Sequence, residues 1–174
     1  MTLPDGYRVR PSRAAELDRL PEVERQADAV YFAALGIEDP KLPPLDLAVF
    51  DLCHAAGTLW VAADRGDEPV GFAAATDLDG ALFVIEMDVV PAHQGRGLGR
   101  ALIEAAIDHA RWAFYPAVAL TTDRYIPFNA PFYARLGFVE LRREDLSPGL
   151  RAVLAREAAV GFDPARRIAM AKRL

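Results

Sequence analysis

The chain has 174 residues, of which 52% are hydrophobic, and its formal net charge is −5 with a pI near 5.2. This size predicts one domain over residues 1–174, and the weakly acidic charge disfavours a nucleic-acid partner, which would need a basic face. No stretch reaches the roughly 18 apolar residues of a membrane span, and charges at Asp5, Arg8 and Arg10 argue against a signal peptide. We therefore expect a cytoplasmic protein with no membrane partner, and the single cysteine, Cys53, predicts neither a disulfide nor a metal site.

The N-terminal third predicts a strand followed by two helices. Polarity alternates over residues 7–10, as is typical of a strand. Pro21 suits the first turn of a helix whose apolar residues recur at helical spacing as far as Gly36. A second amphipathic helix is predicted over residues 45–56 and ends at Gly57.

The middle of the chain predicts three strands, over residues 58–63, 69–76 and 81–90. Short turns join them, which favours antiparallel neighbours. The predicted elements that follow are a helix over 98–114, a strand over 117–122, a short helix over 129–135, a strand over 138–141, a helix from 147 to 160 and a strand over 167–171. The pattern indicates an α/β fold, with a mixed sheet flanked by helices.

The third of these strands leads into a glycine-rich segment, QGRGLG at residues 94–99, directly before a helix. Glycines allow close approach of the backbone to a ligand, and the first turn of a helix offers unpaired N–H groups and a positive dipole end. Both features suit a phosphate group, and Arg96 and Arg100 add positive charge. The spacing matches neither a dinucleotide-binding fingerprint nor a P-loop, and a plain glycine turn remains the alternative.

Two ordered motifs resemble those of the GNAT superfamily of acetyl-CoA-dependent N-acetyltransferases. MDVVP at residues 87–91 precedes QGRGLG, which matches the family signature Q/R-x-x-G-x-G/A after a strand, and NAPFYARLGF follows at 129–138. The resemblance implies a GNAT-type mixed, mostly antiparallel sheet flanked by helices. It covers a core of about residues 7–141, and a C-terminal helix and strand follow at about 147–174.

The resemblance also implies how acetyl-CoA, as cosubstrate, would be held. The pyrophosphate would lie on the backbone of Gln94, Gly95, Arg96, Gly97, Leu98 and Gly99, with Arg100 nearby. The pantetheine arm would run along the backbone of Met87, Asp88 and Val89. Asn129 would contact the arm, and Phe132 would pack beside it.

For catalysis, the resemblance implies direct attack of a neutral amine on the thioester, with Tyr133 protonating the departing thiolate. Glu86 is the first candidate for the base that deprotonates the amine, and Asp88 falls on the same face of the strand. Asp123 is a weaker candidate for contact with the acceptor. The alternatives are a core role for Tyr133 and, for Glu86, an exposed edge carboxylate or one that only orders the acceptor.

The acceptor is predicted only as an amine, either a small molecule or a peptide, and the proline link at Pro40, Pro43 and Pro44 is expected to shape its side of the site. Dimerisation is common in the family, but no interface is predicted. Two rival functions are a non-catalytic acyl-CoA-binding regulatory module of the same fold and a protein-interaction domain with a fortuitous glycine turn.

Overall fold

The computed structural model describes residues 3–37 and 44–174, so Pro40 and Pro43 of the proline link lie outside the described residues. The chain forms two compact units, Met1–Ala75 with Glu86–His109 and Thr76–Ile85 with Ala110–Leu174. Seven strands are hydrogen-bonded in the order β1-β2-β3-β4-β5-β7-β6. β4 and β5 pair in parallel, whereas β1–β2, β2–β3, β5–β7 and β6–β7 pair antiparallel. The predicted mixed, mostly antiparallel sheet is therefore confirmed.

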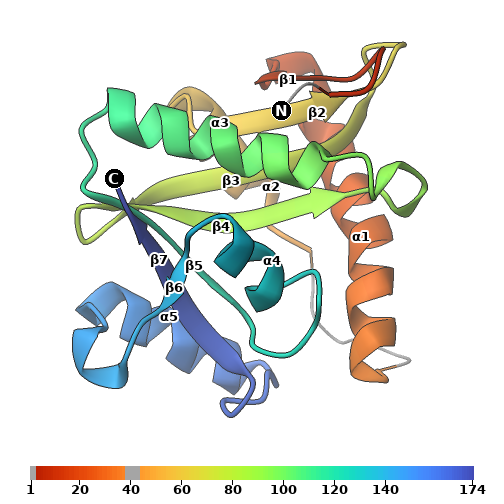
Figure 1. Ribbon diagram of the computed structural model, residues 1–174. Helices are drawn as coiled ribbons and strands as arrows, with labels where there is room; N and C mark the ends of the chain where they lie inside the picture. Colours follow the sequence, from red (N-terminus) through yellow and green to blue (C-terminus); the bar gives the residue numbers. More distant parts are fainter. Residues whose placement is uncertain (1–2, 38–43) are drawn as a thin grey trace. The chain divides into compact units, whose positions relative to one another are not determined.

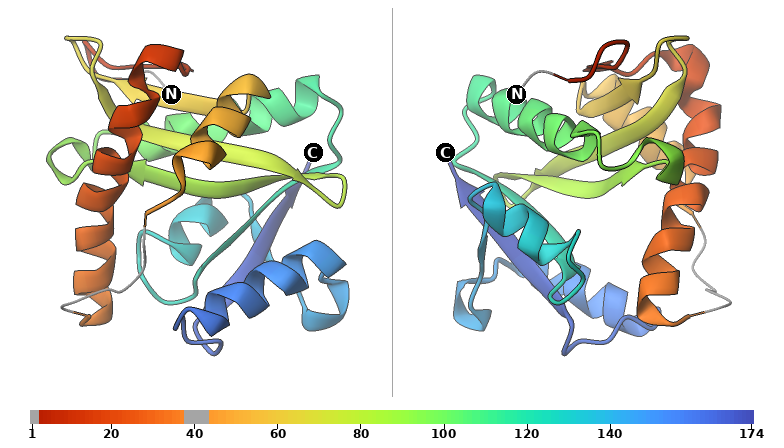
Figure 2. Two further views of the ribbon diagram at one scale, coloured as in Figure 1. Left: turned by 180° about the vertical axis from the view of Figure 1, so that it is seen from behind. Right: turned by 45° about the vertical axis from the view of Figure 1, so that its right-hand side comes forward.

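The first unit places helices on both faces of β2 and β3. Its elements are β1 (Arg8–Pro11), η1 (Ala14–Arg19), α1 (Leu20–Leu35), α2 (Leu47–Ala55), β2 (Leu59–Ala63), most of β3 (Pro69–Leu78), the end of β4 (Ala81–Val89), η2 (Pro91–His93) and most of α3 (Leu98–Trp112). α2 lies on one face of these strands and α3 on the other (Figures 1 and 2). Phe50 of α2 meets Phe72 of β3 edge to face, with ring centroids 5.2 Å apart and both side chains fully buried. This contact anchors α2 to the sheet.

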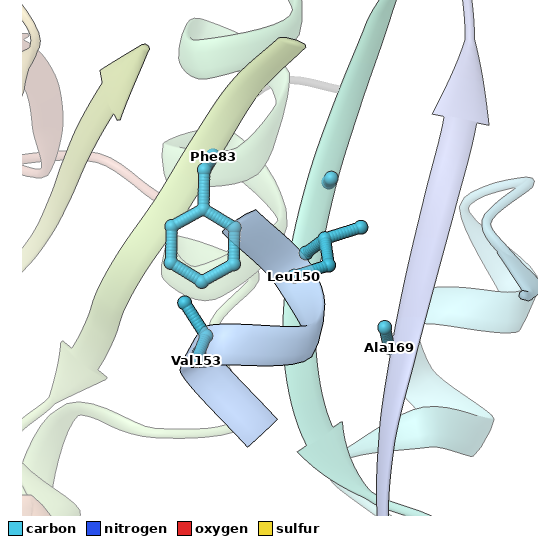
Figure 3. Packing of buried hydrophobic residues seen from close by; sticks show 5 residues of the cluster. Phe83, Leu150, Val153 and Ala169 are labelled. Carbon is cyan, nitrogen blue, oxygen red and sulfur yellow. The ribbon is translucent and has the colours of Figure 1, made fainter. Parts of the chain in front are cut away.

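The second unit has its core where α5 covers three strands. Its elements are the start of β4, then β5 (Ala117–Asp123), α4 (Ala130–Arg135), β6 (Val139–Glu140), η3 (Arg143–Asp145), α5 (Pro148–Ala159) and β7 (Arg167–Arg173). Leu150 and Val153 of α5 pack against Phe83 of β4 and Ala169 of β7 (Figure 3). Ser147 begins α5, because its side chain accepts the N–H of Leu150 at 3.2 Å.

Every helix and strand predicted from the sequence is present, with ends that differ by one or two residues. Residues that begin or end helices explain this agreement. Gly36 ends α1 in the left-handed conformation, at φ 70°, and the side chain of Asp46 caps the start of α2. The predicted strand over 138–141 is shorter, at Val139–Glu140. The 3₁₀ helices η1, η2 and η3 were not predicted, because segments this short carry no hydrophobic period. Among the described residues, no helix has the length and apolar character that a membrane crossing requires.

Candidate active site

The glycine-rich loop lies in the first unit, between the end of β4 and the start of α3. Gly95 and Gly97 adopt φ values of 73° and 83°, which residues with a Cβ rarely adopt. The side chain of Gln94 donates a hydrogen bond to the carbonyl oxygen of Val89 at 2.9 Å, so the loop is tied back to the strand that precedes it. Leu98 is fully buried and anchors the start of the helix.

The amide groups of this loop are available to a ligand. Within the described residues, no backbone hydrogen bond is donated by the N–H groups from Gly95 to Arg100, and the first of the helix runs from Ala101 to the carbonyl of Gly97 at 3.0 Å. The loop itself is largely exposed. A row of unpaired amides at the positive end of a 15-residue helix is chemically suited to a pyrophosphate.

Tyr7, near the N-terminus of the chain, contacts two side chains at the glycine-rich loop. The hydroxyl group of Tyr7 is hydrogen-bonded to Nδ1 of His93 at 2.9 Å. The guanidinium of Arg96 stands over the ring of Tyr7, with its Cζ 5.7 Å from the ring centroid. Arg100, the other basic residue of the loop, pairs with Glu104 one turn along α3 at 2.7 Å. Of these two basic residues of the loop, Arg96 is the one without a carboxylate partner among the described residues; its guanidinium donates only to the carbonyl of Ala92, at 3.4 Å.

Four carboxylates from two elements form an acidic cluster in the same unit: Glu24 and Asp28 of α1, and Glu86 and Asp88 of β4. Burial is the main cause that raises the pKa of Glu24 to about 7, and the charges of Glu86 and Asp28 raise it further. Burial also raises the pKa of Asp88 well above its ordinary value, and the three other carboxylates add to this. Glu86 and Asp88 thus share one acidic environment, and Glu86 is half-buried rather than at an exposed edge.

One glycine lets two strands meet closely beside this cluster. A Cβ at Gly71 of β3 would lie 2.7 Å from the carbonyl oxygen of Asp88 and 3.1 Å from Cγ2 of Val89. Any larger residue would push β3 away from the end of β4. Gly71 therefore fixes the position of the strand that carries Glu86 and Asp88.

The second unit holds the other predicted site residues, on and before α4. The side chain of Asn129 donates to Oγ1 of Thr122 on β5 at 3.0 Å, and its carbonyl accepts the N–H groups of Phe132 and Tyr133. Tyr133 is buried, with its ring 5.1 Å from that of Phe132 and 5.7 Å from that of Phe138. α4 ends next to Gly137, at φ 88°. The segment is thus a packed aromatic cluster around the buried ring of Tyr133.

Asp123, the weaker candidate for acceptor contact, has its oxygens fully engaged inside the second unit. They accept two hydrogen bonds from Arg166, at 2.8 and 3.1 Å, and the N–H groups of Tyr125 and Ile126 at 2.7 and 2.9 Å. Burial raises the pKa of this carboxyl, but these hydrogen bonds outweigh it and hold the pKa below its ordinary value. Asp123 therefore orders the turn after β5, which speaks against a role at the acceptor.

Residues 55–140 match the model of the acetyltransferase (GNAT) domain family. The matched region includes the end of β4, the glycine-rich loop and α4. The chain belongs to the GNAT superfamily.

Relatives of this GNAT chain are acetyltransferases by name. It is 33% identical over 132 residues to GCN5-related N-acetyltransferase 1, chloroplastic, of Arabidopsis thaliana, covering 75% of this chain and 59% of that protein. It is 31% identical over 151 residues to mycothiol acetyltransferase of Thermobispora bispora, covering 78% and 48%. The chain thus spans about half of the length of these curated relatives. A GNAT-family acetyltransferase from Staphylococcus aureus has the same fold, with a TM-score of 0.71, 16% identity and coverage of 97% and 99%.

The GNAT site residues predicted from the sequence are distributed over both units. The structure brings Val89 and the loop together through Gln94, and it brings Asn129, Phe132 and Tyr133 together around α4. The sequence did not indicate Glu24 and Asp28 as partners of Glu86 and Asp88. The sequence also showed no sign of the hydrogen bond between Tyr7 and His93, which are 86 residues apart. Helical or strand spacing carries no information about such distant pairs.

Proposed function

We propose that the chain transfers an acetyl group from acetyl-CoA to a primary amine. The observation that carries this proposal is the row of unpaired amides from Gly95 to Arg100 at the start of α3, in a GNAT chain. Backbone N–H groups and a helix dipole bind anions without a mobile side chain, which suits the pyrophosphate of the coenzyme. Arg96 adds a charge-assisted contact, and Arg100 stands one turn away.

The proposed reaction is direct attack of the amine on the thioester. The amine nitrogen forms a bond to the carbonyl carbon, the carbon–sulfur bond breaks, and the thiolate takes a proton from the hydroxyl of Tyr133. The amine must lose its own proton, and Glu86 is the proposed acceptor of that proton. The backbone of Met87, Asp88 and Val89 is the proposed support for the pantetheine arm, with Asn129 and Phe132 beside it.

Release of free thiol from acetyl-CoA with a panel of amines tests this activity. We expect Tyr133→Phe to bind acetyl-CoA as the wild type does by calorimetry, but to lose about a hundredfold in kcat, in the range of general-acid effects. Tyr125→Phe is the matched control, because Tyr125 is an exposed tyrosine of the same unit, and it should keep full activity. Binding of acetyl-CoA without thiol release for any amine would favour the non-catalytic acyl-CoA-binding module instead.

The cytoplasmic location, the single-domain organisation and the amine class of the partner stay predictions from the sequence. If calorimetry showed no binding of acetyl-CoA, the proposed activity would be contradicted, because it depends on coenzyme binding at the amides of the glycine-rich loop.

A further inference from the structure

Tyr7 is held in place at the start of the sheet in the first unit. It lies directly before β1, whose first residue, Arg8, pairs with Ala63 of β2. Gly6, the residue before Tyr7, has φ 92°, and a Cβ at that position would clash with Cγ of Arg65. A side chain there would also strain the backbone. The turn that leads into Tyr7 is therefore closely defined.

The side chain of Tyr7 contacts both the segment before the glycine-rich loop and the loop itself. Its hydroxyl group is hydrogen-bonded to Nδ1 of His93 at 2.9 Å, and the two rings meet edge to face with centroids 5.8 Å apart. On the loop, Cζ of Arg96 lies 5.7 Å from the centroid of the Tyr7 ring. One aromatic ring thus contacts the last residue of η2 and, three residues later, a basic side chain of the loop.

The guanidinium of Arg96 keeps most of its donors for a ligand. A guanidinium has five N–H donors, and within the described residues that of Arg96 makes one hydrogen bond, to the carbonyl of Ala92 at 3.4 Å. The ring of Tyr7 attracts the cation through its face and uses none of these donors. The contact with Tyr7 therefore restrains an exposed arginine and leaves its N–H groups available to an anion.

A restrained arginine binds an anion more tightly than a free one. An exposed arginine samples many rotamers, and fixing it on binding costs conformational entropy. Here the restraint is present before binding, in the same loop as the unpaired amides from Gly95 to Arg100. The side chain of Arg100, in contrast, is paired with Glu104 at 2.7 Å. Of the two arginines, Arg96 is the one prepared for a phosphate group.

Resting on the coenzyme binding proposed above, we propose that Tyr7 is a positioning residue for acetyl-CoA and that it acts through Arg96. The ring of Tyr7 holds the guanidinium at the loop, where its N–H groups donate to phosphate oxygens of the coenzyme. The hydrogen bond to His93, 86 residues away in the sequence, fixes the ring against the loop. A side chain before the first strand thereby sets the affinity for the coenzyme.

A double-mutant cycle with coenzyme A in the calorimeter tests whether Tyr7 acts through Arg96. We expect Arg96→Gln to raise Kd about tenfold and Tyr7→Leu about fivefold, because the first removes a charge-assisted contact and the second removes only its restraint. In the Arg96→Gln background, Tyr7→Leu should have no further effect. A full fivefold effect in that background would overturn the proposal, since it would show that the loss of Tyr7 disturbs the loop itself.

Two further variants are matched controls for this cycle. Tyr7→Phe retains the aromatic ring, so its Kd should stay within about twofold of the wild-type value. A loss as large as that of Tyr7→Leu would contradict the role of the ring. Arg25→Gln removes the same charge as Arg96→Gln from an exposed side chain of α1 in the same unit, and it should leave Kd unchanged. A tenfold loss there would trace the effect of Arg96 to net charge alone and would also overturn the proposal.

Kinetics and salt separate positioning from a general structural role. With the most active amine of the panel, Tyr7→Leu should raise KM for acetyl-CoA and leave kcat unchanged. The increase in KM should shrink as the salt concentration rises, because screening weakens the contact between Arg96 and a phosphate. A fall in kcat, or an increase in KM that does not depend on salt, would contradict the proposed role.

Coenzyme A that lacks its 3′-phosphate identifies the phosphate involved. Equal losses with both ligands assign Arg96 to the pyrophosphate, whereas a loss with coenzyme A alone assigns it to the 3′-phosphate, and either result supports the role of Tyr7. If the wild type binds coenzyme A and releases thiol, but Tyr7→Leu binds coenzyme A equally well, this inference fails and the acetyltransferase activity stands. If the wild type binds no coenzyme A, the proposed activity itself fails.

Discussion

Buried carboxylates in the two units show opposite behaviour. Asp123 in the second unit has a guanidinium and two backbone amides around it, and its pKa is held below the ordinary value. Glu24 and Asp88 in the first unit have no basic partner among the described residues, and their pKa values are raised. Burial penalises the charge in all three cases, so the partners decide the sign. A buried carboxylate with a guanidinium partner keeps its charge, whereas burial without a cationic partner favours the neutral form.

The largest expected effect is loss of stability in Asp123→Asn. The amide keeps one acceptor oxygen but turns N–H donors toward Arg166, so the ion pair between a buried carboxylate and a 35% exposed guanidinium is broken. We expect the free energy of unfolding in urea to fall by about 3 kcal/mol, in the range for breaking a buried pair. Glu140→Gln is the control, since Glu140 pairs with Arg124 at the surface, and it should cost less than about 1 kcal/mol. Similar losses in both variants would contradict the distinction.

The pH dependence of stability should have opposite signs at the two sites. The pKa of Glu24 is raised from 4.5 to about 7, so the folded state holds this proton more tightly than the unfolded state. Its contribution is present below about pH 4.5 and is lost as the pH rises through about 7. The pKa of Asp123 is lowered, so its contribution is present above pH 3.8 and is lost as the pH falls through the folded-state value.

Glu24→Gln isolates the first of these effects. Wild type should lose about 1–3 kcal/mol of stability relative to Glu24→Gln between pH 5 and pH 8. Urea unfolding of both proteins across this range measures the difference. A constant difference would mean that the carboxylate of Glu24 is already compensated by a cation.

A third test makes the same Asp-to-Asn substitution at Asp88, the buried carboxyl of the first unit that has no basic partner among the described residues. Asp88→Asn replaces a carboxyl whose charged form is disfavoured by burial with a neutral amide of the same shape. We expect its free energy of unfolding at pH 7 to lie within about 1 kcal/mol of wild type. A loss as large as that of Asp123→Asn would show that Asp88 has a cationic partner after all.

The sequence predicts local features of this fold well and distant contacts poorly. Gly36, Asp46 and Ser147 mark helix ends because each acts on its immediate neighbours. The glycine-rich loop can be predicted for the same reason, since its glycines and the helix that follows them are adjacent in the sequence. The surroundings of Asp123 and of Asp88 cannot be predicted in this way, because their partners are distant in the sequence. Arg166 is 43 residues from Asp123, and the charges of Glu24 and Asp28 act on Asp88 from 60 or more residues away in the sequence.

The smallest expected effect is that of substituting Glu104, an exposed carboxylate on α3 that pairs with an arginine. It pairs with Arg100 at 2.7 Å, but both side chains are largely in solvent, at 39% and 47% exposure, so the pair contributes little to stability. Glu104→Gln should therefore leave urea unfolding unchanged. It also frees Arg100 beside the loop amides, so we expect coenzyme A affinity at low salt to rise by up to about threefold, and the gain to vanish at high salt. Affinity that falls instead would indicate that Glu104 positions Arg100 for the coenzyme, which would make this surface pair part of the site.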